Sequence, residues 1–136
     1  MGRHEQREQI FKLVFQTEFN TPEEMPEQVK LYFEDEERTF TETDREQMKN
    51  RFQQVQEKLG EIDEMISQKS TGWGLDRMGK VELALLRLAV YEIVFDEDIP
   101  DGVAINEAVE LAKKYGQENS GAFVNAVLAK LVKQGD

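Results

Sequence analysis

AINEAVELAKKYGQENSGAFVNAVL, residues 104–128, predicts two amphipathic helices that meet at a tight corner. Apolar residues recur every three or four positions on both sides of Gly116, which is the spacing of one buried helix face. Gly116 is expected to end the first helix in the left-handed conformation, and Asn119 or Ser120 is expected to cap the second. The stretch therefore predicts a helix–corner–helix unit that is packed through its apolar faces.

Three asparagines stand in this unit and are expected to differ in role. Asn106 and Asn125 lie among apolar residues, so we expect buried amides that bond a loop carbonyl or the opposite helix and fix its register. Asn119 is either a simple cap or part of an anion or phosphate site at the N-terminus of the last helix. Phe123, one turn further on, is either a core residue or an aromatic platform for a nucleobase.

The rest of the chain shows the same helical spacing, and we expect an all-α fold of six or seven helices. Thr21 before Pro22 signals one helix start, and Thr41 with Asp44 signals another. Helices are predicted over about 4–18, from 22 past 33, over 41–69, 78–95 and 101–115, and from 119 or 120 onward. The segment 41–69 is predicted to be one helix roughly 42 Å long, with an apolar stripe that packs within the chain.

A change in composition near residue 72 predicts two packed helical halves, about 1–70 and 71–136, within a single domain. The residues before it are acidic and rich in glutamine, whereas those after it are rich in Ala, Leu and Val. The second half contains LALLRLAVYEIVF, residues 83–95, which is apolar nearly all round and so predicts a central buried helix. Arg87 lies inside this run and needs a carboxylate partner or a route to the surface.

The composition makes several classes of function improbable. The chain has no cysteine, which excludes thiol nucleophiles and thiolate metal sites. Its one histidine, His4, stands in the terminal segment, which argues against a histidine metal site and a Ser-His-Asp triad. We therefore expect no enzyme activity, no cofactor and no metal. The chain shows neither a signal peptide nor an apolar run of the ~18 residues that a membrane span needs. A cytoplasmic protein without membrane contact is the simplest interpretation.

Charge is distributed unevenly along the chain. The net charge is −11, which argues against non-specific binding to nucleic acid. Residues 1–17, however, carry Arg3, Arg7 and Lys12, with His4 as a further potential cation, against only two acidic residues. A local basic patch at the N-terminus therefore remains compatible with an acidic protein.

The chain resembles the NusB family of transcription antitermination factors. The segments that carry the resemblance are Trp73–Met78, Leu85–Glu92, Val103–Ala108, Leu111–Lys113 and Phe123–Asn125. Arg7 and Glu8 before an apolar helix are similar to the start of that family. The resemblance covers nearly the whole chain and is strongest in the C-terminal half, whereas over 20–70 only length and helicity correspond.

The resemblance implies two packed three-helix bundles and a bacterial, non-enzymatic adaptor. Members of the family pair with NusE, a small-subunit ribosomal protein, and the pair binds single-stranded boxA RNA in nascent transcripts, notably ribosomal ones. RNA polymerase in this antitermination complex resists termination. The RNA-binding positions of the family match Arg3, His4, Arg7, Asn119 and Phe123, and the NusE-binding positions match Phe15 and Glu82.

Two departures from the family pattern leave an alternative open. The N-terminus keeps only two arginines where the family has several, and Phe123-Val124-Asn125 is followed by Ala126 instead of glycine. Each lost phosphate contact weakens RNA binding and lowers the slope of log K against log salt by about one unit. The alternative is an acidic helical protein-interaction module with little RNA binding of its own. An apolar surface for NusE could also pair two copies into a homodimer when NusE is absent.

Overall fold

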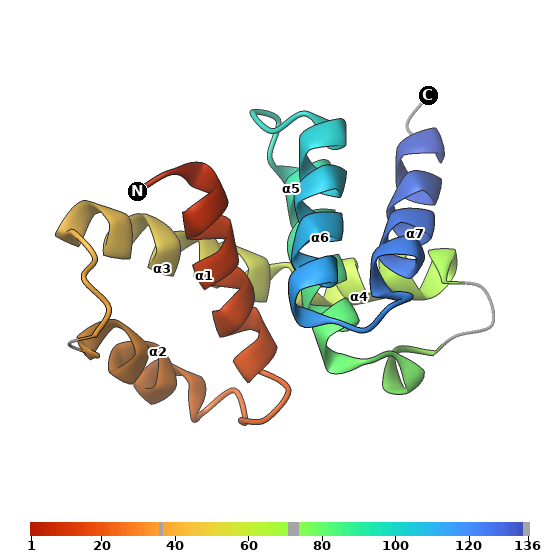
Figure 1. The fold of residues 1–136 in the computed structure, drawn as a ribbon. Coiled ribbons are helices and arrows are strands. Elements are labelled where there is room, and N and C mark those ends of the chain that lie inside the picture. Colours follow the sequence, from red (N-terminus) through yellow and green to blue (C-terminus); the bar gives the residue numbers. More distant parts are fainter. Residues whose placement is uncertain (36, 71–73, 135–136) are drawn as a thin grey trace. The chain divides into compact units, whose positions relative to one another are not determined.

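The computed structural model describes residues 1–35, 37–70 and 74–134, and these residues form seven α-helices and one short 3-10 helix with no strand (Figure 1). The predicted all-α fold is therefore confirmed. The chain divides into two compact units, Met1–Gln56 and Glu57–Asp136. The division lies earlier than residue 72 because the helix before that position packs onto the helices that follow it. Trp73 and most of the predicted loop around it lie outside the described residues.

The first unit contains α1 (Arg3–Gln16), α2 (Met25–Glu34) and nearly all of α3 (Glu42–Glu57). Of the two predicted threonine caps, the one at Thr41 is confirmed, whereas the one at Thr21 is wrong because Thr21 bonds the turn before α2 and Glu24 is the N-cap of that helix. The Glu24 backbone N–H lies 3.3 Å from Thr21 Oγ1, and the Thr21 N–H donates to Glu24 Oε1 over 2.7 Å. Residues 22–24 form a turn, so α2 itself begins only at Met25. At α3 the Asp44 N–H donates to Thr41 Oγ1 over 3.1 Å.

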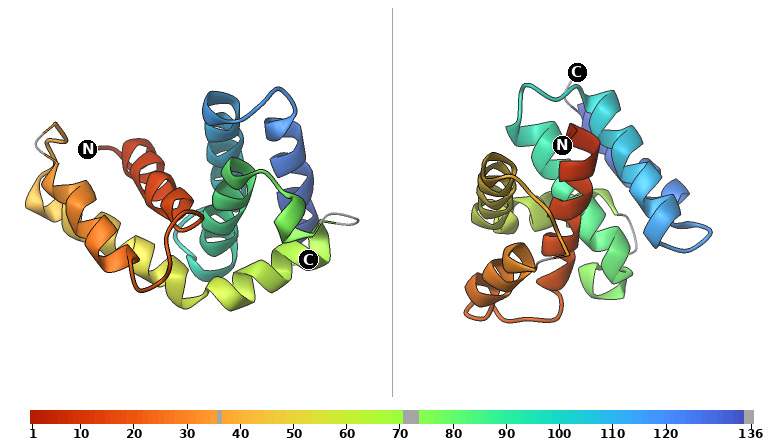
Figure 2. Two further views of the ribbon diagram at one scale, coloured as in Figure 1. Left: turned by 90° about the horizontal axis from the view of Figure 1, so that it is seen from below. Right: turned by 60° about the vertical axis from the view of Figure 1, so that its left-hand side comes forward.

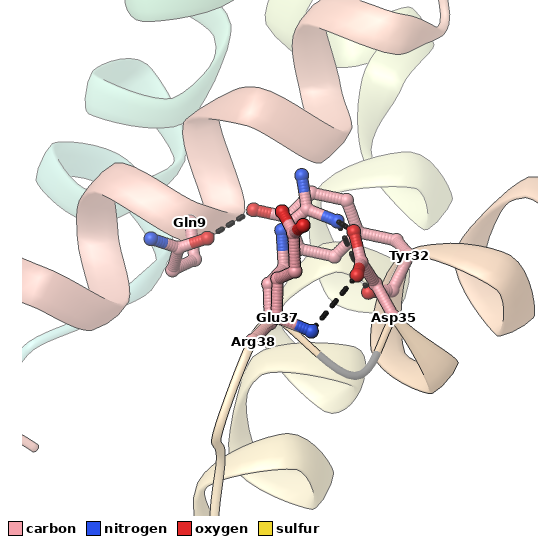
Figure 3. A network of polar contacts seen from close by, with 5 residues as sticks. All are labelled: Gln9, Tyr32, Asp35, Glu37 and Arg38. Carbon is pink, nitrogen blue, oxygen red and sulfur yellow. Dashed lines mark hydrogen bonds and ion pairs between the residues drawn. The ribbon is translucent and has the colours of Figure 1, made fainter.

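Polar side chains link the elements of the first unit (Figure 3). The Tyr32 hydroxyl on α2 donates to the Gln9 side-chain oxygen on α1. The Arg38 guanidinium lies 3.9 Å from the centre of the Tyr32 ring and 2.8 Å from an Asp35 carboxylate oxygen. Asp35 also accepts the Glu37 backbone N–H over 3.0 Å. These contacts fold the segment after α2 back onto the end of that helix.

The prediction of one continuous helix over 41–69 is wrong. The chain forms α3 and then α4 (Leu59–Lys69), separated at Lys58, whose backbone angles of φ −102° and ψ 8° leave the helical range. The apolar stripe nevertheless continues through the break, with Met48 and Val55 before it and Ile62 after it fully buried. The two parts of the stripe belong to different units. Periodicity alone could not reveal this, because it is the same on both sides of the break.

The second unit contains α4, the 3-10 helix η1 (Leu75–Arg77), α5 (Lys80–Phe95), α6 (Asp101–Tyr115) and α7 (Ser120–Gln134). Helices α5, α6 and α7 pack against one another, and α4 packs against α5 and α7 (Figures 1 and 2). The prediction of a buried central helix is confirmed by α5, in which Leu85, Leu86 and Val90 are at most 1% exposed. Over the described parts of the chain, no helix combines the length and apolarity needed to cross a membrane.

Candidate functional site

The corner between α6 and α7 is shaped by close packing around Gly116. Gly116 has φ −95° and ψ −159°, so the predicted left-handed cap is wrong and the residue is extended. Glycine is needed here for space: a Cβ at this position would lie 2.5 Å from Ser120 Oγ and 2.8 Å from the Ala112 carbonyl oxygen. The Gly116 N–H donates to that same carbonyl over 2.8 Å and closes α6. The corner is therefore a tight, sterically defined turn.

Asn119 and Phe123 follow this turn and line one pocket of about 300 Å³. Asn119 precedes α7 and is exposed, and its carbonyl accepts the Phe123 N–H over 3.1 Å as the first helical bond. The Phe123 ring is half-buried, so part of it stays accessible. The pocket thus presents an amide and an aromatic surface side by side, which are the groups that bond and stack a nucleobase.

Glu82, predicted as a partner contact, lines the same pocket. It stands in the first turn of α5, where a carboxylate is favoured by the helix dipole. The Ser120 hydroxyl at the start of α7 donates to Glu82 Oε1. The other oxygen, Oε2, lies over Gly79, where a Cβ would collide with it. The structure therefore brings Glu82, which the family resemblance assigns to NusE, together with Asn119 and Phe123, which it assigns to RNA.

The pocket also contains residues that the sequence analysis did not single out for function. Arg77 and Gln117 are exposed at the pocket, and Met78 forms a buried part of its lining. Arg77 and Met78 belong to one of the motifs that carry the family resemblance, so their motif was a signal. Gln117 had no comparable signal, since only the fold places the corner beside the start of α5.

The N-terminal basic residues do not share one environment. Arg3 and His4 are exposed in the first turn of α1, where cationic groups remain accessible to a phosphate. Arg7 is only 7% exposed and interacts with other groups in the described part of the chain. The structure thus leaves Arg3 and His4 at the surface and makes Arg7 part of the packed side of the helix.

Phe15, the other predicted partner contact, belongs to a row of aromatic rings on α1. Its ring centre lies 6.1 Å from that of Phe11 and 5.1 Å from that of Phe19 in the turn after the helix. Phe11 is buried, Phe15 is half-buried and Phe19 is 60% exposed. The row therefore leads from the packed side of the helix to an apolar surface.

The prediction that Asn106 and Asn125 are buried is wrong, because both side chains are exposed. Asn125 follows the buried Val124, and Asn106 lies two residues from the buried Ala104 and Ala108, but both asparagines are themselves on the solvent side of their helices. The prediction for Arg87 is confirmed. Its guanidinium pairs with the Asp63 carboxylate on α4, with an Nε to Oδ1 distance of 2.9 Å.

No group of three or more metal-ligating side chains that could hold an ion occurs among the residues that the structure describes. The pocket instead offers an amide, an aromatic ring, a guanidinium and a carboxylate. Such groups recognise polar and aromatic ligands by hydrogen bonding, stacking and charge. The pocket therefore offers groups that are suited to binding a polar or aromatic ligand.

Comparison with known proteins identifies the family. A family model described as the NusB family matches residues 4–133. The chain belongs to the NusB family. Transcription antitermination protein NusB of Lachnoclostridium phytofermentans is 50% identical over 132 residues, which cover 97% of this chain and 99% of the relative.

Solved structures of NusB proteins share the fold. T. maritima NusB has a TM-score of 0.87 and 37% identity, covering 98% of this chain and 92% of that one. A structure of the antitermination factors NusB and NusE in complex with dsRNA has a TM-score of 0.80 and 28% identity, covering 98% and 99%. The resemblance to NusB seen in five sequence motifs is thereby confirmed, and the NusB match extends through both units.

Proposed function

We propose that the protein is a transcription antitermination factor that binds boxA-like RNA together with NusE. In this role it joins the antitermination complex on nascent transcripts, notably ribosomal ones, and helps RNA polymerase resist termination. The observation that carries the proposal is the pocket at the α6–α7 corner, which is lined by Asn119, Phe123 and Arg77. Relatives that match nearly the full length of the chain are antitermination proteins, which supports the same conclusion.

The proposed mechanism is recognition of single-stranded RNA without catalysis. A base stacks on the accessible part of the Phe123 ring or bonds the Asn119 amide, which supplies both a donor and an acceptor. Arg77 at the pocket and Arg3 on α1 supply positive charge for phosphates, and the exposed His4 imidazole is a further polar contact. The protein acts as a cytoplasmic adaptor in this mechanism and needs no cofactor.

NusE is proposed to contact Phe15 in the first unit and, separately, Glu82 in the second. The exposed ring of Phe19 extends the apolar surface that begins at Phe15, and aromatic residues of this kind dominate protein interfaces. The partly accessible Glu82 carboxylate offers a negative charge to a basic partner. The same apolar surface could pair two copies of the chain when NusE is absent.

The alternative function, a protein-interaction module with little RNA binding, is favoured by one observation. Arg7 is buried, so fewer N-terminal cations reach the surface than the sequence suggests, in a chain of net charge −11. Under this alternative, NusE would supply most of the charge that holds RNA.

A titration with labelled boxA RNA separates the two functions. The protein is titrated at fixed salt with and without NusE, and scrambled RNA of the same length serves as the control. We expect boxA to bind more tightly than scrambled RNA, and Asn119→Ala and Phe123→Ala to weaken this binding while circular dichroism shows unchanged helicity. NusE binding without any preference for boxA would support the alternative instead.

A further inference from the structure

The start of α7 is tied to the start of α5 through one buried serine. Ser120 is 3% exposed, and its hydroxyl oxygen accepts the Gln117 backbone N–H over 2.8 Å. The same hydroxyl donates to the Glu82 carboxylate. Ser120 thus connects the backbone of the corner to the Glu82 side chain at the start of another helix.

Two glycines provide the space that this connection needs. A Cβ on Gly116 would lie 2.6 Å from Ser120 Cβ, and a Cβ on Gly79 would collide with Glu82 Oε2. Both glycines have negative φ values that any residue can adopt, so neither is required by its backbone conformation. Gly116 is the more restrictive of the two, because its Cβ would also meet the Ala112 backbone, whereas at Gly79 only the end of the Glu82 side chain would have to move.

The residues proposed to bind RNA flank this connection directly. Asn119 precedes Ser120 in the chain, and Phe123 lies on the next turn of the same helix. All of these residues, together with Glu82, line one pocket. The direction in which Asn119 and Phe123 project therefore depends on how the first turn of α7 is held.

We propose that Glu82 and Ser120 are positioning residues of the RNA site. Their hydrogen bond holds the corner and the first turn of α7 in the geometry that presents Asn119 and Phe123 to RNA, and this inference rests on the proposed function. A buried Ser120 has no surface to offer to RNA, so it acts through its neighbours. Pre-organisation of this kind raises affinity because the corner need not be ordered when RNA binds.

Two substitutions of Glu82 separate positioning from charge. Glu82→Gln keeps an oxygen at the right distance to accept the Ser120 hydroxyl but removes the negative charge. Glu82→Asp keeps the charge but is one methylene shorter and cannot reach Ser120 in the same backbone geometry. Ser120→Ala removes the donor. Glu118→Gln, an exposed change beside Asn119, is the matched control for the loss of one negative charge at the corner.

The experiment measures affinity for boxA RNA and for scrambled RNA at several salt concentrations, for the protein alone and at saturating NusE. Because Glu82 is also proposed to contact NusE, the measurement on the protein alone tests the positioning role. We expect Glu82→Asp and Ser120→Ala to weaken boxA binding by about fivefold or more, a size typical of coupling between sites. For the protein alone, Glu82→Gln should weaken boxA binding less than Glu82→Asp does. In the Ser120→Ala background, replacing Glu82 by Asp should cause no further loss. The salt dependence should keep its slope, since no phosphate contact is removed.

The possible outcomes are distinguishable. If Glu82→Asp and Ser120→Ala lower the unfolding temperature but bind boxA like the wild type, the bond is only structural and the positioning role is overturned. Equal losses in Glu82→Gln and Glu82→Asp would show that charge or size matters and would also overturn it. A wild-type protein that does not prefer boxA over scrambled RNA would instead refute the proposed function itself. If Ser120→Ala does not fold, the comparison of Glu82→Gln with Glu82→Asp tests the positioning role on its own.

Discussion

Arg87 on α5 forms a bidentate ion pair with Asp63 on α4: Nε lies 2.9 Å from Oδ1, and Nη2 lies 3.0 Å from Oδ2. The side chains are 11% and 24% exposed, so the pair is largely withdrawn from water. A planar guanidinium fits a carboxylate in this two-point arrangement, which fixes the orientation of both groups. The pair therefore sets how α4 lies against the central helix of the second unit.

Removing one partner should destabilise the protein. Asp63→Ala leaves the Arg87 guanidinium partly buried without its carboxylate, and we expect a loss of about 2 kcal/mol in the free energy of unfolding. The double variant Asp63→Ala with Arg87→Met should lose less than the sum of the single variants, as urea unfolding can measure. Additive losses would show that the pair contributes no coupling.

Glycine substitutions should have opposite effects at the two ends of α6. Gly116→Ala places a methyl group 2.8 Å from the Ala112 carbonyl oxygen, and we expect a destabilisation of about 1–3 kcal/mol. Gly102→Ala, in the first turn of α6, meets no atom within 4 Å and should stabilise the protein by about 0.5 kcal/mol. Thermal unfolding of both variants tests this, and a neutral Gly116→Ala would show that the corner yields easily.

Arg3 and Arg7 should respond differently to substitution. Arg3→Gln removes an exposed cation, so it should lower the dependence of log Kd on log salt by about one unit if Arg3 contacts a phosphate. Arg7→Gln replaces a buried side chain, so it should chiefly lower the unfolding temperature. Fluorescence titrations with boxA RNA over a range of salt concentrations, beside thermal unfolding, measure both effects. A reduced slope with unchanged stability in Arg7→Gln would contradict this assignment.

Phe19 should matter for NusE binding and little for stability. Its ring is 60% exposed, and Phe19→Ala should weaken NusE binding by about tenfold, as expected of an aromatic interface residue. Leu31→Ala on α2 removes another large apolar side chain, which is 51% exposed, and serves as the matched control. Calorimetric titration with NusE gives both affinities. Equal effects of the two variants would mean that the aromatic row is not the docking surface.

The stability of the segment before α2 should depend on pH through the Glu24 carboxylate. The Thr21 backbone N–H, and to a lesser degree the Thr21 side chain, lower the pKa of Glu24 below its ordinary value of 4.5. A lowered pKa in the folded state adds stability above pH 4.5, and this stability is lost as the pH falls through the folded value. Thr21→Ala removes only the smaller, side-chain contribution and keeps the backbone N–H, so the pKa of Glu24 should rise in an NMR titration but stay below 4.5. Thr43→Ala on α3 should leave it unchanged.

The helical elements follow closely from local patterns in the sequence. The threonine cap at position 41 and the apolar spacing along 83–95 predict where α3 begins and which helix is central, because capping and amphipathicity involve residues only three or four apart. The signal at Thr21 marked a turn instead, and α2 begins only at Met25. The same patterns failed at Lys58, where an unbroken stripe passes through a break between helices. They also placed Asn106 and Asn125 inside the core, since one position on a helix turns a side chain by about 100°.

The sequence by itself determined the helical class, the family and the candidate residues Asn119, Phe123 and Glu82. Only the tertiary structure decided that these three line one pocket, because Glu82 is far from the corner in the chain and reaches it through the packing of α5 against α7. The burial of Arg7 likewise depended on how α1 packs. Local periodicity carries no information about such contacts, which exist only once the helices have packed.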